Sequence, residues 1–112
     1  MEVQLLKQVR SGIGRPMDED TYLRRVVMLP FVPFKGLELF DHKDFYAEIT
    51  CVKYHIPSKI FVCWTPLDDR LSRYYHPDSL EPRCTRPIAE LVAEWEAKGW
   101  QQLSYAAVKE MV

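Results

Sequence analysis

The sequence contains, at residues 85–100, the stretch TRPIAELVAEWEAKGW, which gives the clearest structural signal of the chain. Thr85 is a typical helix N-cap, and Pro87 suits the first turn. Apolar side chains then recur at the spacing of one helical face, at Ile88, Leu91, Val92 and Trp95. Gly99 can adopt the left-handed conformation that ends many helices. The pattern predicts a helix over residues 86–98, packed through its apolar face.

Upstream of this helix, residues 46–56 and 59–65 are rich in β-branched and aromatic side chains and flank Pro57-Ser58, which predicts a β-hairpin. The loop length decides the register. A three-residue loop, 57–59, places on one face Val52, Tyr54, Ile56, Ile60, Val62 and Trp64. It places on the other face Cys51, Lys53, His55, Phe61, Cys63 and Thr65. A two-residue loop would mix the two sets, so we predict the three-residue loop.

The remaining elements are less sharply defined. Acidic residues precede Arg24 and Arg25, an order that complements a helix dipole and predicts a short helix near 18–25. Val26 to Phe34 is expected to be a strand whose prolines suit a sheet edge. The opening segment fits either a strand or a helix. The C-terminal segment fits a strand over 100–107 or a helix over 101–111.

These elements together predict an α+β fold. Strands come first and the main helix follows, an order that favours a small antiparallel sheet of three to four strands with the 86–98 helix packed on one face. At 112 residues, with 47% hydrophobic and 28% charged residues, the chain has the composition of one globular domain spanning 1–112.

Charge and cysteine content narrow the classes of partner. A formal net charge of −1 provides no field that would attract a nucleic acid. The longest apolar run, Val26 to Phe34, is too short to span a bilayer, so no membrane association is expected. Residues 1–10 lack the continuous apolar stretch of a secretory signal, and the cysteines, Cys51, Cys63 and Cys84, form an odd set. We therefore predict reduced thiols and a cytoplasmic location.

The hairpin supplies the first candidate site. In the predicted register Cys51, His55 and Cys63 share one face, and Lys53 lies directly across from Cys63. Catalysis would use Cys63 as a nucleophile, with a pKa lowered by Lys53 and with His55 as its base. Two cysteines and a histidine could also bind zinc, but their spacing matches no compact zinc pattern, so no metal and no cofactor are predicted. A half-buried structural face is the more ordinary explanation.

The second candidate site is the irregular segment between the hairpin and the helix. Its cationic, phenolic and imidazole groups could bind a phosphate, a carboxylate or the polar groups of a partner, and they are Arg70, Arg73, Tyr74, Tyr75 and His76. The alternative is a solvated surface in which Asp68 and Asp69 pair with Arg73 at helical spacing.

No nucleotide-binding, metalloprotease or hydrolase motif occurs in the chain. Aromatic side chains are more numerous than one helix and a small sheet need for a core. We therefore expect a non-enzymatic binding or protein-interaction module that homodimerises, through either the face bearing Phe61 and Cys63 or the proline-broken segment 26–34. The alternative is a small enzyme or ligand-binding protein that uses one of the two candidate sites.

Overall fold

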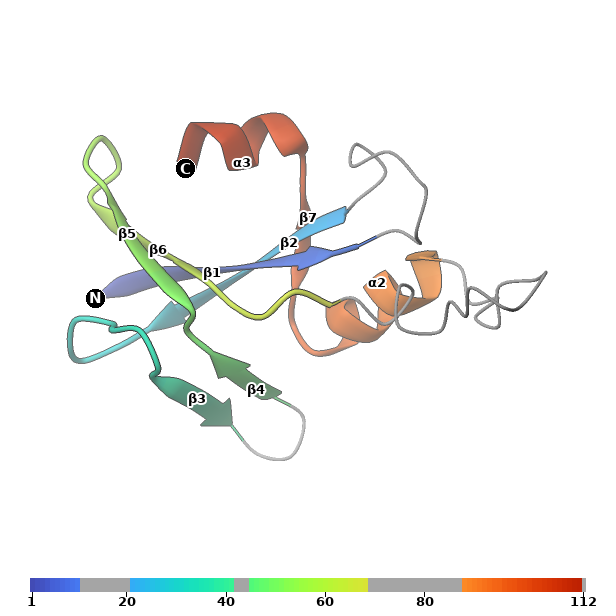
Figure 1. Ribbon diagram of the computed structural model, residues 1–112, viewed down its shortest axis with the longest axis horizontal. Coiled ribbons are helices and arrows are strands. Elements are labelled where there is room, and N and C mark those ends of the chain that lie inside the picture. The colour runs from blue at the N-terminus through green and yellow to red at the C-terminus, as the bar shows by residue number, and fades with distance from the viewer. Residues whose placement is uncertain (11–20, 42–44, 69–87, 112) are drawn as a thin grey trace, which may run out of the picture.

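The computed structural model describes residues 1–10, 21–41, 45–68 and 88–111 (Figure 1). The fold is α+β, and its described part contains a five-stranded sheet, a two-stranded hairpin and two helices. The elements in chain order are β1 (Glu2–Val9), β2 (Thr21–Met28), β3 (Glu38–Asp41), β4 (Phe45–Glu48), β5 (Cys51–His55), β6 (Ile60–Trp64), α2 (Ile88–Ala97), β7 (Gln101–Leu103) and α3 (Tyr105–Met111).

The five-stranded sheet is mixed, with the strand order β5-β6-β1-β2-β7. Its middle strand is β1, which pairs antiparallel with β2 and parallel with β6. The predicted sheet of three to four antiparallel strands is therefore only roughly matched. The opening segment, which fitted a strand or a helix equally, is a strand buried on both faces. Its adjacent Leu5 and Leu6 point to opposite faces and are both buried, as expected of a strand covered on both sides.

The helix predicted near 18–25 is wrong, because Thr21–Met28 forms β2, while 18–20 lie outside the described residues. A favourable charge order stabilises a helix by only about 0.3–1 kcal/mol, whereas pairing with both β1 and β7 favours the extended chain. The strand predicted over 26–34 holds only as far as Met28. Pro30 and Pro33 lack the N–H groups that a ladder would need.

The predicted hairpin register is also wrong. His55 pairs with Ile60 across a four-residue turn, so Tyr54 lies opposite Phe61 rather than opposite Val62. The turn ends at Lys59, which has a φ of 57° and donates its N–H to the carbonyl of His55 at 2.9 Å. The three-residue loop was predicted because it makes one face of the hairpin apolar. In the structure β6 is covered on both faces, so this criterion does not determine the register. The predicted strand 46–56 is likewise divided, into β4 and β5.

The helix predicted from the C-terminal stretch is confirmed as α2 within the described residues. Leu91 is buried, and Gly99 has a φ of 96°. The N–H of Trp100 donates to the carbonyl of Trp95 at 3.2 Å, and the two rings meet edge to face with centroids 6.0 Å apart. These contacts form the Schellman motif that ends α2 and directs the chain into β7.

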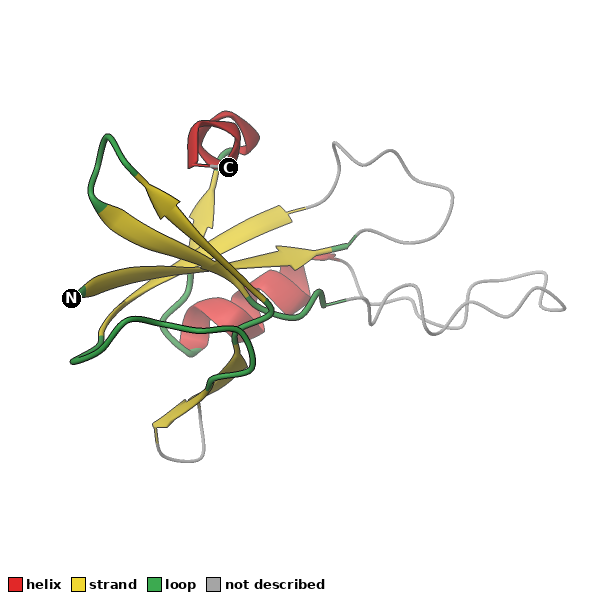
Figure 2. Cartoon of the chain, turned by 60° about the vertical axis from the view of Figure 1, so that its left-hand side comes forward, coloured by secondary structure: helices red, strands yellow, loops and turns green. Residues whose placement is uncertain are grey.

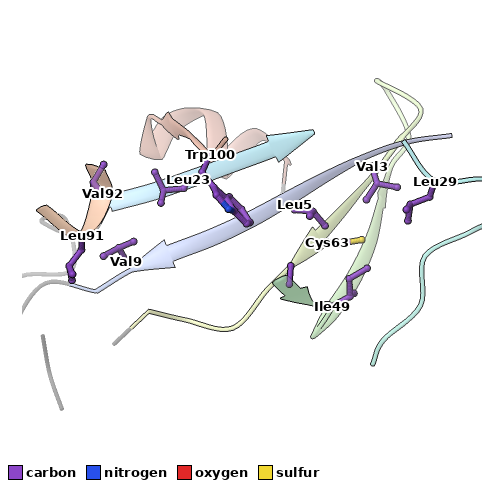
Figure 3. Close-up of a cluster of buried hydrophobic side chains, with 11 residues drawn as sticks. Val3, Leu5, Val9, Leu23, Leu29, Ile49, Cys63, Leu91, Val92 and Trp100 are labelled. Atoms are coloured by element: carbon purple, nitrogen blue, oxygen red, sulfur yellow. The ribbon is translucent and has the colours of Figure 1, made fainter. Parts of the chain in front are cut away.

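The two helices lie on opposite faces of the sheet (Figure 2). The α2 face holds the main core, shown in Figure 3, which consists of Val3, Leu5, Val9, Leu23, Leu29, Ala47, Ile49, Cys63, Leu91, Val92 and Trp100. On the α3 face Leu6, Val62 and Val108 are buried. The C-terminal alternatives each hold in part, because β7 is a strand and α3 is a helix.

In the part of the chain that is described, no helix has both the length and the apolar character needed to cross a membrane.

Candidate functional site

The structure does not bring the first candidate site together. Because Lys53 pairs with Val62 and Cys63 with Val52, the side chain of Cys63 points to the α2 face, whereas Lys53 and His55 point to the α3 face. His55 is instead bonded through Nδ1 to the hydroxyl of Ser58, within its own turn. The imidazole therefore shapes the hairpin turn and is directed away from the thiol.

The environment of Cys63 is unsuited to a nucleophile. Its side chain is fully buried in the main core. Burial raises the pKa of the Cys63 thiol to about 11, and the nearby Cys51 adds to the increase. The thiol therefore stays protonated near neutral pH, whereas nucleophilic attack requires a thiolate.

The second candidate site, Arg70 to His76, lies outside the described residues, so its ligand-binding role stays a prediction. The structure does describe Asp68, which precedes this segment in the chain. The N–H of Asp68 donates to the carbonyl of Gln8 at 2.9 Å, and the N–H of Arg10 donates to the carbonyl of Asp68 at 2.9 Å. The chain thus leaves the sheet beside the end of β1.

Next to this exit lies a buried polar cluster that the sequence patterns did not predict. The ammonium of Lys7, a residue only 5% exposed, donates to the carbonyl of Pro66 at 2.8 Å. It also lies 4.5 Å from the ring centroid of Trp95 and 5.6 Å from that of Trp100. The indole N–H of Trp95 donates to Oδ2 of Asp68 at 2.7 Å. The cluster thereby connects β1, α2, the residue that precedes β7 and the chain after β6.

This arrangement compensates the cost of burying a charge. A carbonyl and two aromatic faces surround the ammonium and replace part of its hydration. A signal for the cluster does exist in the sequence, because Lys7 is the one charged member of the alternating series Val3, Leu5, Lys7 and Val9. The contacts of this cluster are those of a structural link between parts of the fold. Among the described residues no group of three potential ligands could hold a metal ion.

The most distinctive surface is the segment 26–34, which the sequence indicates as a possible dimer contact. Its large apolar side chains are exposed by 44–70%, and they are Val26, Met28, Phe31, Val32 and Phe34. The rings of Phe31 and Phe34 contact each other, with centroids 6.4 Å apart. Such a run of exposed apolar side chains is characteristic of an interaction surface.

The backbone of this segment is fixed to the fold. Leu29 and Pro33 are buried, and the N–H of Leu29 donates to the carbonyl of Met1 at 2.9 Å. Just beyond the far end the N–H of Gly36 donates to the carbonyl of Ile49 at 2.8 Å, and the N–H of Leu37 closes a turn on the carbonyl of Phe34 at 3.1 Å. The aromatic side chains are therefore presented on an anchored backbone, which lowers the conformational entropy lost when a partner binds.

The alternative dimer surface, the face bearing Phe61 and Cys63, is not available in this form. Cys63 is buried, and the ring of Phe61 packs against that of Tyr54 with centroids 4.9 Å apart. A further exposed aromatic pair, Phe40 opposite Tyr46, occupies the outer face of the β3–β4 hairpin, where the Tyr46 hydroxyl donates to Glu38 at 3.0 Å. Of the two predicted contact surfaces, the structure leaves segment 26–34 exposed.

Comparison of the chain with models of protein families, with curated proteins and with solved structures finds no match.

Proposed function

We propose that this chain is a non-enzymatic protein-interaction module that homodimerises through segment 26–34. The observation that carries the proposal is the exposure of five large apolar side chains within nine consecutive residues, on a backbone that is anchored at both ends. Keeping this surface in water is unfavourable by roughly 25 cal/mol for each Å² of apolar area, and a partner would remove that penalty.

The character of the segment also fits an interface. Phenylalanine and methionine are enriched in the centres of protein interfaces, where charged side chains are depleted. Between Val26 and Phe34 no residue is charged. Enzymatic chemistry has weaker support, because the described part of the chain separates Cys63 from His55 and Lys53 and surrounds Lys7 with its own aromatic rings. An enzyme built on Arg70 to His76 remains the alternative.

The proposal is tested by measuring the mass of the native protein by light scattering at tens of micromolar. We expect twice the 13.2 kDa of one chain. The double substitution Phe31→Ser and Phe34→Ser should return the protein to the mass of one chain with its far-ultraviolet circular dichroism unchanged. The matched control is Phe40→Ser, which removes a more exposed phenylalanine outside the segment and should leave the dimer intact.

A wild-type protein that has the mass of one chain up to several hundred micromolar would refute self-association. A dimer that is lost with Phe40→Ser and kept in the double variant would move the contact to the β3–β4 hairpin.

A further inference from the structure

The outer edge of β2 is only partly occupied. Its neighbour on that side, β7, pairs with Tyr22 to Arg24 and no further. The far end of β2, Val26 to Met28, has no strand on that side among the described residues. A strand edge left open in this way presents a template for another chain.

The hydrogen bonds between β1 and the end of β2 show which backbone groups face this open edge. Met1 and Leu29 exchange both bonds of a pair, because the amine of Met1 donates to the carbonyl of Leu29 at 2.8 Å and the N–H of Leu29 donates to the carbonyl of Met1 at 2.9 Å. Hydrogen-bonded pairs alternate along an antiparallel ladder. Val27, opposite Val3, therefore bonds towards β1, whereas Val26 and Met28 direct their N–H and C=O groups to the open edge.

We propose that a second copy of this chain adds to the open edge of β2, antiparallel and with the two-fold axis at Val27, so that the two sheets become one. This inference rests on the proposed homodimer and names its contact. With the axis at Val27, Val26 pairs with Met28 of the second copy and Met28 pairs with Val26 of the second copy. Each pair exchanges two hydrogen bonds, so all the outward groups of both residues are satisfied.

The side chains favour the same occupant. Val26 and Met28 are 47% and 70% exposed and point to one face of the sheet, so the two-fold pairing places a valine beside a methionine on each side of the axis. Pro30 has no N–H and prevents the pairing from running further along the segment. A self-complementary contact of this kind closes at two copies and does not propagate into a fibre.

The contact also explains the position of the remaining apolar residues. Phe31, Val32 and Phe34 follow the paired strand directly on each copy. They are placed to cover the ends of the joined strands, where an aromatic border would exclude water from the new hydrogen bonds.

The test is amide hydrogen exchange of the wild-type protein, resolved by residue with NMR, at about 5 and about 500 micromolar. Pairing at the edge should slow exchange of the Val26 and Met28 amides by at least about tenfold at the higher concentration, because the two chains must separate before these amides can exchange. The internal control is the Val27 amide, which bonds towards β1 and should exchange slowly at both concentrations.

A substitution gives a second readout. Met28→Pro removes one outward N–H, which an edge position tolerates, and should convert the dimer to a single chain without loss of the β-sheet spectrum. If this variant unfolds, the exchange measurement on the wild type decides. A dimer whose Val26 and Met28 amides exchange equally fast at both concentrations would overturn the edge pairing and leave the proposed homodimer standing. A protein that stays a single chain at 500 micromolar would overturn both.

Discussion

A single buried lysine, Lys7, holds together four parts of the fold that are distant in sequence. Its ammonium contacts the carbonyl of Pro66 and two indole rings, and Asp68 binds one of those rings. The beginning of the segment after β6 is therefore fixed by these side chains in addition to the backbone hydrogen bonds that join Thr65 and Asp68 to β1.

The substitution Lys7→Met keeps most of the apolar stem and removes the charge. The Pro66 carbonyl loses its donor and both indole rings lose their cation, so we expect the free energy of unfolding to fall by about 1–3 kcal/mol in urea titrations. Lys109→Met is the matched control, because Lys109 also lies over a ring, that of Tyr105 at 4.6 Å, but is exposed. Its effect should stay within about 0.5 kcal/mol. Equal effects of the two substitutions would contradict the structural role of Lys7.

The buried thiol of Cys63 predicts a pH dependence. Its pKa is raised from 9.0 to about 11 in the folded chain, so above pH 9 the unfolded chain loses this proton first. The proton is then bound more strongly by the folded state, and the free energy of unfolding should fall between about pH 9 and pH 11. Below pH 9 this contribution is constant.

The measurement is urea unfolding under reducing conditions at several pH values. Cys63→Ala should flatten the decline relative to the wild type, whereas Cys51→Ala, at the half-buried thiol on the other face, should retain most of it. Parallel pH profiles for the wild type and Cys63→Ala would show that this thiol does not contribute.

At the scale of the element, the end of α2 depends on Gly99. A side chain at φ 96° is strained, and a Cβ there would lie 3.4 Å from Cζ of Arg25, whose Nη1 donates to the carbonyl of Lys98 at 2.6 Å. Gly99→Ala should therefore cost about 1–2 kcal/mol from the backbone conformation, because the distance to Arg25 is an ordinary van der Waals contact.

Gly36 provides the comparison for this prediction. Its φ is 92°, yet a Cβ added at Gly36 would have no atom within 4 Å outside the adjoining residues. Gly36→Ala should show the same backbone cost, so the thermal midpoints of the two variants should fall by similar amounts. A clearly larger loss for one variant would contradict a shared backbone origin.

Sequence reasoning succeeded for elements whose signal is local. The spacing of Leu91 and Trp95 and the glycine that follows were enough for α2 and its termination. It failed for β2 and for the hairpin register, because both depend on partners that are distant in sequence. For segment 26–34 the predicted edge strand ends at Met28 and the dimer contact stays a prediction. The partners of Lys7 could not be predicted, since Pro66 and Trp95 approach it only in the folded chain.

At the scale of the whole molecule, the sheet lies between the two helices and has buried side chains on both of its faces. Leu5 and Leu6 are adjacent in β1, point to opposite faces and are both almost fully buried. Leu5→Ala and Leu6→Ala should therefore each reduce the free energy of unfolding by about 2–5 kcal/mol. A sheet covered on the α2 face alone would tolerate the second change, so a loss below about 0.5 kcal/mol for Leu6→Ala would contradict the burial of Leu6.

The central position of β1 has a consequence for the growing chain on the ribosome. The middle strand of the sheet is the first to be synthesised, and β6, its parallel neighbour, ends at Trp64. At about 5–20 residues per second, roughly 3–10 s pass between the synthesis of Val9 and that of β6. Throughout that interval one edge of this strand, with its buried Leu5 and Leu6, has no neighbour, so nascent chains should be bound by chaperones until the β5–β6 hairpin has emerged.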